Sequence, residues 1–219
     1  MTIRKQRRKE GIPRGVISRL PKYYRYLSGL SQAQEKISSA ELGKALNMTA
    51  AQIRSDLSYF GSFGLHGYGY RVDELKNHIS AILGLDREYS LVLIGAGNLG
   101  RAIASYPNFR KRGFIIKAIF DADPEVIGTE LAGLTIRSID TLEDYLQANP
   151  CDIAVITTPK EASQAVCDRI CRAGIKAIWN FSPLDLRVPN DVILEHTHLT
   201  DSLLQLSFQI TNNETEKSS

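Results

Sequence analysis

The chain has 219 residues, 43% of them hydrophobic, which is enough for one large domain or two small ones with buried cores. No apolar run approaches the roughly 20 residues of a membrane helix, and no apolar signal core follows the basic N-terminus, so we expect a cytoplasmic protein without a membrane partner. The net charge of +3 divides unevenly: residues 1–80 carry +8 and residues 81–219 carry −5, which predicts that the first part meets a polyanion.

The first part begins with a basic arm, residues 1–14, that we expect to be disordered. The first helix is predicted from about Val16 to Ser28, and Pro21 inside it is expected to delay its start. A second helix begins at Ser38, where Glu41 three residues later completes a capping box. This helix is short and ends near an asparagine that can serve as its C-cap.

A third helix is predicted from Thr49 to a stop at Gly61. Two short helices joined by so few residues are typical of a helix-turn-helix, whose second helix enters the major groove of DNA. Arginine can read guanine there, and hydroxyl groups can contact phosphate. An ordinary solvated helix face is the alternative interpretation. The candidate DNA contacts are Thr49, Gln52, Arg54, Ser55, Ser58 and Tyr59.

The glycine- and aromatic-rich segment 61–72 favours a β-hairpin, the wing of a winged helix. His66 and Tyr68 in this hairpin are further candidate DNA contacts. A helix capped by Asp73 then closes a predicted DNA-binding domain over residues 1–84.

Strands and helices alternate in the second part, residues 85–199. This order predicts an α/β fold with a doubly wound parallel sheet, a Rossmann domain. Strands are expected at 91–95, 114–120, 153–157, 175–179 and 192–195, with a short one near 134–137, and helices at 98–106, 141–148 and 161–173.

The first of these strands runs directly into the pattern GxGxxG and a helix, which is the fingerprint of a dinucleotide-binding turn. The second glycine admits the pyrophosphate, and an acid at the end of the next strand, Asp121, can bind the ribose of NAD(H) rather than NADP(H). Asp123 is the alternative acid. Thr158 and Pro159 follow a strand at the same edge of the sheet. The turn comprises Gly95, Ala96, Gly97, Asn98, Leu99 and Gly100.

No acid–base pair stands out for catalysis, and no residues have metal-ligand spacing, so we expect neither catalytic nor metal-binding residues. The chain has three cysteines, Cys151, Cys167 and Cys171, and this odd number fits a reducing compartment. The cysteines either pack as small buried apolar residues or form a thiol switch. Two alternatives remain for the whole chain. One is a small NAD-dependent dehydrogenase with an unrelated N-terminal extension, and the other is a DNA-binding protein that senses a CoA or NADP derivative.

A last helix is predicted at residues 200–211, before a disordered tail at 212–219. Its side chains are too apolar for a solvated tail. The helix therefore packs either on its own subunit or on a partner.

Together these segments resemble the redox-sensing repressor Rex family of bacteria, over about residues 17–208. The resemblance rests on the motifs ISRL (17–20), IRSDLSYFG (53–61), GYGY (67–70), GAGNLG (95–100), FDADP (120–124) and WNFSP (179–183). It implies a homodimer with a swapped last helix, which binds double-stranded operator DNA when NADH is low and releases it when NADH binds. It also implies that Tyr106 approaches the nicotinamide and that Arg25 pairs with the swapped helix.

The chain departs from the family pattern at three places. Ser55 stands where the family usually has lysine, and Leu65 and His66 stand at a wing tip that is usually basic. His198 stands where an acidic residue usually opens the swapped helix, with Asp201 nearly one turn on. We therefore expect a changed set of phosphate contacts and a changed redox-coupling pair, in which His198 takes part with Arg25 and Tyr106.

Overall fold

The computed structural model describes residues 12–30, 33–61 and 69–217, so most of the predicted basic arm and the wing residues His66 and Tyr68 lie outside the described residues. The chain divides into two compact units, residues 1–87 and 88–219. In the described part, no helix has both the length and the apolar character needed to cross a membrane.

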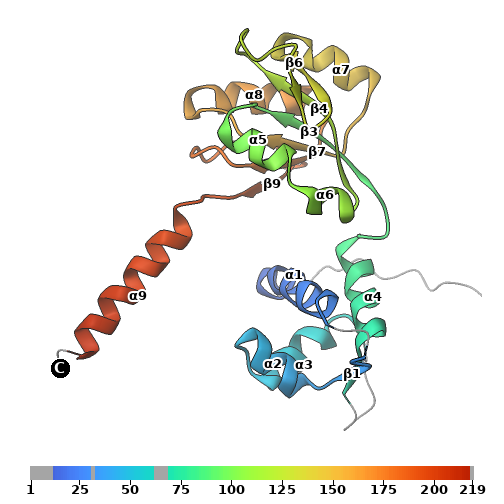
Figure 1. Cartoon of the computed structure of the whole chain (residues 1–219), viewed down its shortest axis with the longest axis vertical. Coiled ribbons are helices and arrows are strands. Elements are labelled where there is room, and N and C mark those ends of the chain that lie inside the picture. The colour runs from blue at the N-terminus through green and yellow to red at the C-terminus, as the bar shows by residue number, and fades with distance from the viewer. Residues whose placement is uncertain (1–11, 31–32, 62–68, 218–219) are drawn as a thin grey trace, which may run out of the picture. The chain divides into compact units, whose positions relative to one another are not determined.

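Unit 1 is a small, mostly helical domain (Figure 1). Its buried apolar side chains form one core. Its core side chains come from all of its described helices and include Leu20, Tyr23, Ile53 and Leu75. Two short strands, β1 and β2, pair antiparallel and close the domain. Its elements are α1 (Arg14–Ser28), β1 (Lys36–Ile37), α2 (Ser39–Leu46), α3 (Ala50–Ser58), β2 (Tyr70–Arg71) and α4 (Val72–Leu83).

Helix caps place α2 and α3 as the sequence predicts. Ser38 and Glu41 form the predicted capping box, and Thr49 accepts a hydrogen bond from the Gln52 amide. Asn47 ends α2 in the left-handed conformation. Gly43 allows the tight turn, because a Cβ atom there would lie 2.6 Å from the Met48 carbonyl oxygen.

Several predicted boundaries in unit 1 are wrong. α1 begins at Arg14 and contains Pro21, because burial of its apolar face outweighs the one lost hydrogen bond. α3 ends at Ser58, three residues before Gly61. β2 pairs with β1, a strand that precedes α2 and that we did not predict. α4 begins at Val72, with Arg71 rather than Asp73 at its N-cap.

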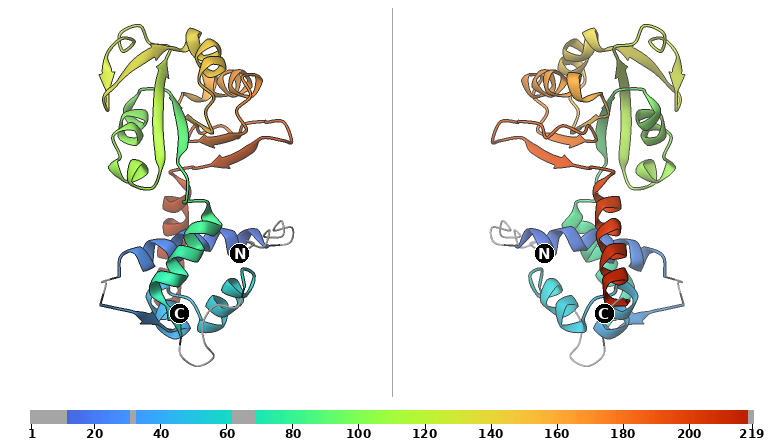
Figure 2. Two further views of the ribbon diagram at one scale, coloured as in Figure 1. Left: turned by 90° about the vertical axis from the view of Figure 1, so that its right-hand side faces the viewer. Right: turned by 90° about the vertical axis from the view of Figure 1, so that its left-hand side faces the viewer.

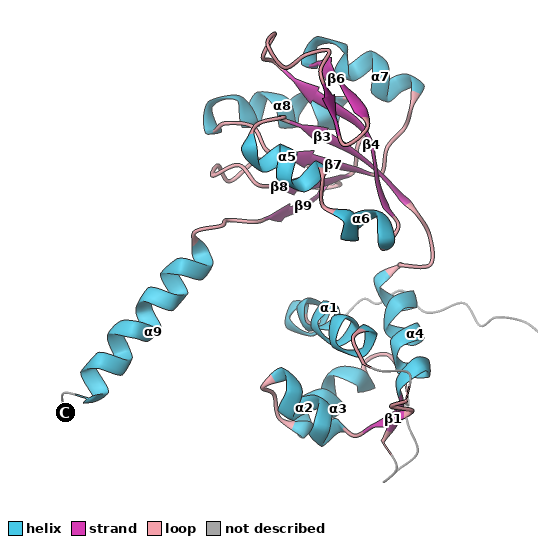
Figure 3. Cartoon of the chain, in the orientation of Figure 1, coloured by secondary structure: helices cyan, strands magenta, loops and turns pink. Residues whose placement is uncertain are grey.

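Unit 2 is built on a seven-stranded sheet of order β5-β6-β4-β3-β7-β8-β9, parallel except for the β5–β6 pair (Figure 3). Strands β4, β5 and β6 lie on one side of β3, and β7, β8 and β9 lie on the other. The strand order therefore reverses between β3 and β7, which is the switch point of the sheet. Its strands are β3 (Tyr89–Ile94), β4 (Phe114–Asp121), β5 (Glu130–Leu131), β6 (Leu134–Ser138), β7 (Ile153–Ile156), β8 (Ala177–Asn180) and β9 (Ile193–His196).

Helices cover both faces of this sheet, and Figure 2 shows α5 and α6 on one side and α7 and α8 on the other. The alternation within β3 explains this, since Leu91 and Leu93 face one core while Val92 and Ile94 face the other. This is the predicted doubly wound Rossmann architecture, with α6 as an unpredicted addition. The helices are α5 (Asn98–Ala104), α6 (Pro107–Lys111), α7 (Leu142–Ala148) and α8 (Lys160–Arg172), with a 3-10 turn at Ile139–Thr141.

The last helix, α9 (Asp201–Lys217), is longer than predicted. The expected disordered tail is wrong through Lys217, because no glycine or proline follows Ile210 to stop the helix. The Thr211 hydroxyl also donates a hydrogen bond to the Ser207 carbonyl within the helix. All of its side chains from Asp201 to Asn213 are exposed on this chain.

Candidate nucleotide and DNA sites

The glycine turn lies at the carboxyl end of β3, beside the switch point of the sheet. Gly95 has a φ of +102°, and a Cβ atom there would lie 2.9 Å from the Thr157 backbone. A Cβ atom at Gly100 would lie 1.9 Å from the Gly95 carbonyl oxygen, so only glycine lets α5 pack under the turn. These two glycines shape the backbone of the turn.

Gly97 differs from its two neighbours, because a Cβ atom there would meet nothing within 4 Å. The turn is open at this point, beside the first-turn amides of α5, which have no partner within their own helix. Backbone amides at a helix start favour an anionic ligand. Gly97 therefore leaves room for a phosphate group to approach the main chain.

A cavity of about 710 Å³ adjoins the turn, a volume suited to a small-molecule ligand. It brings together most of the predicted nucleotide-site residues. Asn98 is exposed and Gly100 is buried beneath the turn, and neither lines the cavity. The predicted residues in its lining are Gly95, Ala96, Gly97, Leu99, Asp121, Thr158 and Pro159, and the alternative acid Asp123 joins them.

Asp121 bonds directly to the glycine turn. One carboxylate oxygen accepts the Ala96 amide, and the other accepts the Asp123 amide at 2.9 Å. A carboxylate has about four acceptor sites, so the group can still accept a hydroxyl from a ligand. Asp121 thus holds the turn in place as well as facing the cavity.

Sequence reasoning missed the face of α8 that lines the same cavity. The lining residues on this face recur at helical spacing, and that spacing was the available signal; they are Ala162, Ala165, Val166 and Arg169. Arg169 forms a bidentate ion pair with Glu143, in which both nitrogen–oxygen distances are 2.6 Å. These hydrogen bonds lower the pKa of Glu143 and keep both groups charged.

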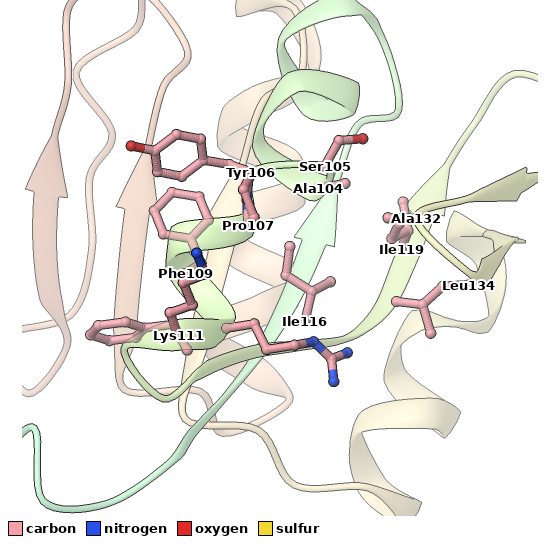
Figure 4. Close-up of a pocket in the computed structure, with 12 residues that line it drawn as sticks. Ala104, Ser105, Tyr106, Pro107, Phe109, Lys111, Ile116, Ile119, Ala132 and Leu134 are labelled. Carbon is pink, nitrogen blue, oxygen red and sulfur yellow. The ribbon is translucent and has the colours of Figure 1, made fainter.

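Tyr106 does not line the 710 Å³ cavity. It lies at a second cavity of about 550 Å³ in unit 2, which is lined by residues of α5, α6 and β4. Figure 4 shows Tyr106 and Phe109 on one side of this pocket and Ile119, Ala132 and Leu134 on the other. The Tyr106 ring packs edge-on against Phe109, with ring centroids 5.0 Å apart.

In unit 1, a buried carboxylate attaches α3 to α1. Asp56 is fully buried and accepts two hydrogen bonds from the Arg19 guanidinium, at 2.6 and 2.7 Å. It also accepts hydrogen bonds from the Tyr23 hydroxyl and, at 2.7 Å, from the side-chain amide of Gln52. Burial raises the pKa of Asp56, but these hydrogen bonds outweigh it, and the pKa stays below its usual value.

The predicted DNA contacts on α3 and its two cap residues are all exposed, and several already have partners. The Arg54 guanidinium donates to the Ser39 hydroxyl at 3.1 Å, and the Ser58 hydroxyl donates to the Ser55 carbonyl. Gln52 is held by Asp56 within its own helix. The exposed set on this face is Thr49, Gln52, Arg54, Ser55, Ser58 and Tyr59.

The three predicted redox-coupling residues lie in different surroundings. Arg25 is exposed on α1 in unit 1, and Tyr106 lines the second cavity in unit 2. His198 lies just before α9, where one ring nitrogen is 3.2 Å from an Asp185 carboxylate oxygen. Asp185 was not singled out from the sequence, because it lies in an irregular loop 13 residues away.

Two family models match the chain, one in each unit. The family described as "Putative DNA-binding protein N-terminus" matches residues 11–58, and the "CoA binding domain" family matches residues 86–184. The first match covers α1 to α3. The second covers the glycine turn and most of the sheet.

Curated relatives and solved structures match nearly the whole chain. The redox-sensing transcriptional repressor Rex of Thermoanaerobacter pseudethanolicus is 50% identical over 94% of this chain and 93% of its own length. That of Clostridioides difficile is 52% identical over 91% and 95%. The crystal structure of RSP with β-NAD⁺ and operator DNA has a TM-score of 0.88 and 48% identity, over 94% of this chain and 96% of its own.

A second RSP structure, with β-NADH, also has a TM-score of 0.88, at 46% identity over 95% of this chain and 98% of its own. The two curated relatives are transcriptional repressors and RSP is a Rex-family repressor, which contradicts the dehydrogenase alternative. The comparisons confirm the resemblance drawn from the sequence motifs. The chain belongs to the Rex family of redox-sensing transcriptional repressors.

Proposed function

We propose that this chain binds NAD(H) at the glycine turn of unit 2, binds operator DNA through α3 of unit 1, and leaves the DNA when NADH binds. The observation that carries the proposal is the opening at Gly97 beside the 710 Å³ cavity, in a chain whose other unit is a basic helix-turn-helix. The bound molecules of RSP, NAD⁺ with operator DNA in one structure and NADH in another, support the same pairing of ligands.

Each part of the dinucleotide has a candidate partner. The main chain at Gly97 and the first turn of α5 would receive the pyrophosphate. Asp121 would accept the ribose hydroxyls and would repel a 2′-phosphate, which favours NAD(H) over NADP(H). Tyr106, which lines the second cavity, would approach the nicotinamide, as the resemblance to the Rex family implies. This arrangement uses the residues that the sequence predicts.

For DNA, Arg54 is the candidate base-reading side chain. Its guanidinium donates to the Ser39 hydroxyl at 3.1 Å, and the side chain is exposed, so it can turn toward a guanine at little cost. The hydroxyls of Thr49, Ser58 and Tyr59 are candidate phosphate contacts that fix the register of the helix.

The chain would act as a homodimer through α9. Its large apolar side chains Leu203, Leu204, Leu206, Phe208 and Ile210 are between 52% and 68% exposed. Such a row of apolar groups is costly in water and marks an interaction surface. A second copy of the chain would cover it, as the predicted helix swap requires.

The proposed switch is a shift between two dimer arrangements. Two recognition helices must lie about 34 Å apart to enter successive major grooves. A ligand can favour one arrangement only by its difference in affinity for the two. Since NAD⁺ and NADH differ only at the nicotinamide ring, the contacts that discriminate them must lie there, and Tyr106, Arg25 and His198 are the candidates.

Linkage provides the test. If NADH weakens operator binding by some factor, the operator must weaken NADH binding by the same factor, typically about 5- to 150-fold. Calorimetric titration of the full chain with NADH, with and without operator duplex, measures that factor. Equal NADH affinity in the two titrations would refute the switch, and NAD⁺ serves as the matched control ligand.

A further inference from the structure

The segment that joins β9 to α9 carries a group of three potential metal ligands. His196 is the last residue of β9, His198 follows two residues later, and Asp185 comes from the loop after β8. Their ligand atoms all lie within 4.8 Å of one another. We propose that Asp185, His196 and His198 bind one divalent transition-metal ion of the Zn²⁺ class. The proposal goes beyond the proposed function and does not rest on it.

The distances suit an ion of this size. Ligand atoms 2.0–2.2 Å from a tetrahedral Zn²⁺ lie about 3.4 Å apart. One Asp185 carboxylate oxygen lies 3.2 Å from Nε2 of His198 and 4.0 Å from Nδ1 of His196. The Asp185 side chain is 87% exposed, so it can move the few tenths of an ångström that the longer distance requires.

The two histidines are held more firmly than the acid. Each side chain is only 26% exposed. The backbone between them is fixed by the Thr197 amide, which donates to the Asn180 carbonyl at 2.8 Å, and the Thr197 hydroxyl accepts the Trp179 ring N–H at 2.9 Å. Preorganised ligands lower the entropy cost of binding an ion.

Asn180 lies beside the candidate ligand atom of His196. Its buried amide nitrogen lies 3.0 Å from Nδ1 of His196. The side-chain oxygen of Asn180 accepts the Ser182 amide, which fixes the orientation of the group. The amide nitrogen also reaches the carbonyls of Leu184 and Ser182, so an ion can take Nδ1 without leaving the amide unpaired.

The donor set points to the class of ion. Two imidazoles and one carboxylate suit Zn²⁺ and its neighbours Co²⁺ and Ni²⁺ better than Mg²⁺ or Ca²⁺, which prefer all-oxygen sites. Three protein ligands leave a fourth position for water or another group. This departs from the expectation of no metal, because the three residues converge only through the pairing of β8 with β9.

An ion there would tie the loop after β8 to the start of α9. The Asp201 amide, the first of α9, donates to the His198 carbonyl at 3.2 Å. The ion would therefore restrict the direction in which the chain leaves the sheet for its last helix.

The test is a titration of the chelator-treated full chain with ZnCl₂ alone, by calorimetry. We expect one ion per chain, and an affinity that falls at least about 10-fold in Asp185→Asn and in His198→Gln. Asp185→Asn is the cleaner variant, because its exposed side chain is not needed for folding; circular dichroism checks both.

Two matched controls separate the other possible ligands. His78→Gln removes an exposed histidine outside the cluster, and Cys171→Ser removes a thiol; neither should change the affinity. The proposal is overturned if no ion binds, if either Asp185→Asn or His198→Gln binds Zn²⁺ as wild type does, or if only Cys171→Ser loses the ion.

Discussion

Replacing Arg19 with alanine is expected to destabilise unit 1 strongly, although Arg19 lies partly on the surface. Asp56 has no exposed side-chain area, and Arg19 provides two of its four hydrogen bonds and its paired positive charge. The variant leaves a buried carboxylate without a cation. Because the Arg19–Asp56 ion pair joins α1 to α3, its loss should loosen α3, the proposed recognition helix.

The magnitude follows from burial. Removing one partner of a buried ion pair costs about 3–5 kcal/mol. The Arg19 side chain is 27% exposed and two hydrogen bonds to Asp56 remain, so we expect the lower end, about 3 kcal/mol. Tyr23→Phe removes one hydrogen bond to a charged group and should cost about 2 kcal/mol.

The matched control is Arg71→Ala, which breaks a surface pair with Glu74 whose side chains are 69% and 65% exposed. Such pairs contribute about 1 kcal/mol or less. Hydrogen exchange of the α3 amides in the full chain measures the local free energy of opening. Fluorescence of Trp179, the sole tryptophan, reports unit 2 separately and should not change. An Arg19→Ala cost no larger than that of Arg71→Ala would refute the reasoning.

The same network has a defined acid dependence. The folded pKa of Asp56 lies below the usual value of about 4. Its stabilisation is therefore complete above the unfolded-state pKa and is lost as the pH falls through the lower folded pKa. Exchange of the α3 amides should accelerate in that acid range in wild type, and Asp56→Asn should flatten this dependence.

Four further variants test the assigned sites. Arg54→Ala should weaken operator binding by about 1–3 kcal/mol, which is roughly 5- to 150-fold in a gel-shift titration. The NADH affinity of this variant should be unchanged, and an equal loss of DNA and NADH binding would contradict the assignment. Gly97→Val should fold normally, because the position is open, but it should lose NADH binding in calorimetry. Gly100→Ala should instead lower the melting temperature, because its Cβ atom would lie 1.9 Å from the Gly95 carbonyl oxygen. If NADH still released Gly97→Val from DNA normally, the phosphate role of Gly97 would be disproved. Deletion of residues 201–219 should lower the mass seen by light scattering, and an unchanged mass would remove α9 from the proposed interface.

Local signals made much of this fold predictable from the sequence. The capping box at Ser38 predicted the start of α2, and the glycine turn at Gly95 pointed to the candidate nucleotide site, because both depend on residues close in the chain. The alternation of strands and helices was likewise enough to predict the parallel sheet.

What was missed depends on contacts between distant residues. The Asp56 network joins residues 37 positions apart, and the pairing of β1 with β2 joins segments on either side of α2 and α3. The Asp185, His196 and His198 cluster exists only because β8 and β9 lie side by side. The extra turns of α9 were missed for a different reason, because residues 211–217 carry no apolar side chains whose spacing could predict a helix.

The central claim is that NADH, and not NAD⁺, releases this chain from DNA. Fluorescence anisotropy tests it most directly, with a labelled duplex that carries the operator of a Rex-family relative. We expect the complex to persist when NAD⁺ is added and the anisotropy to fall to that of free duplex as NADH is titrated. A complex unaffected by saturating NADH, or released equally by both nucleotides, would contradict the account.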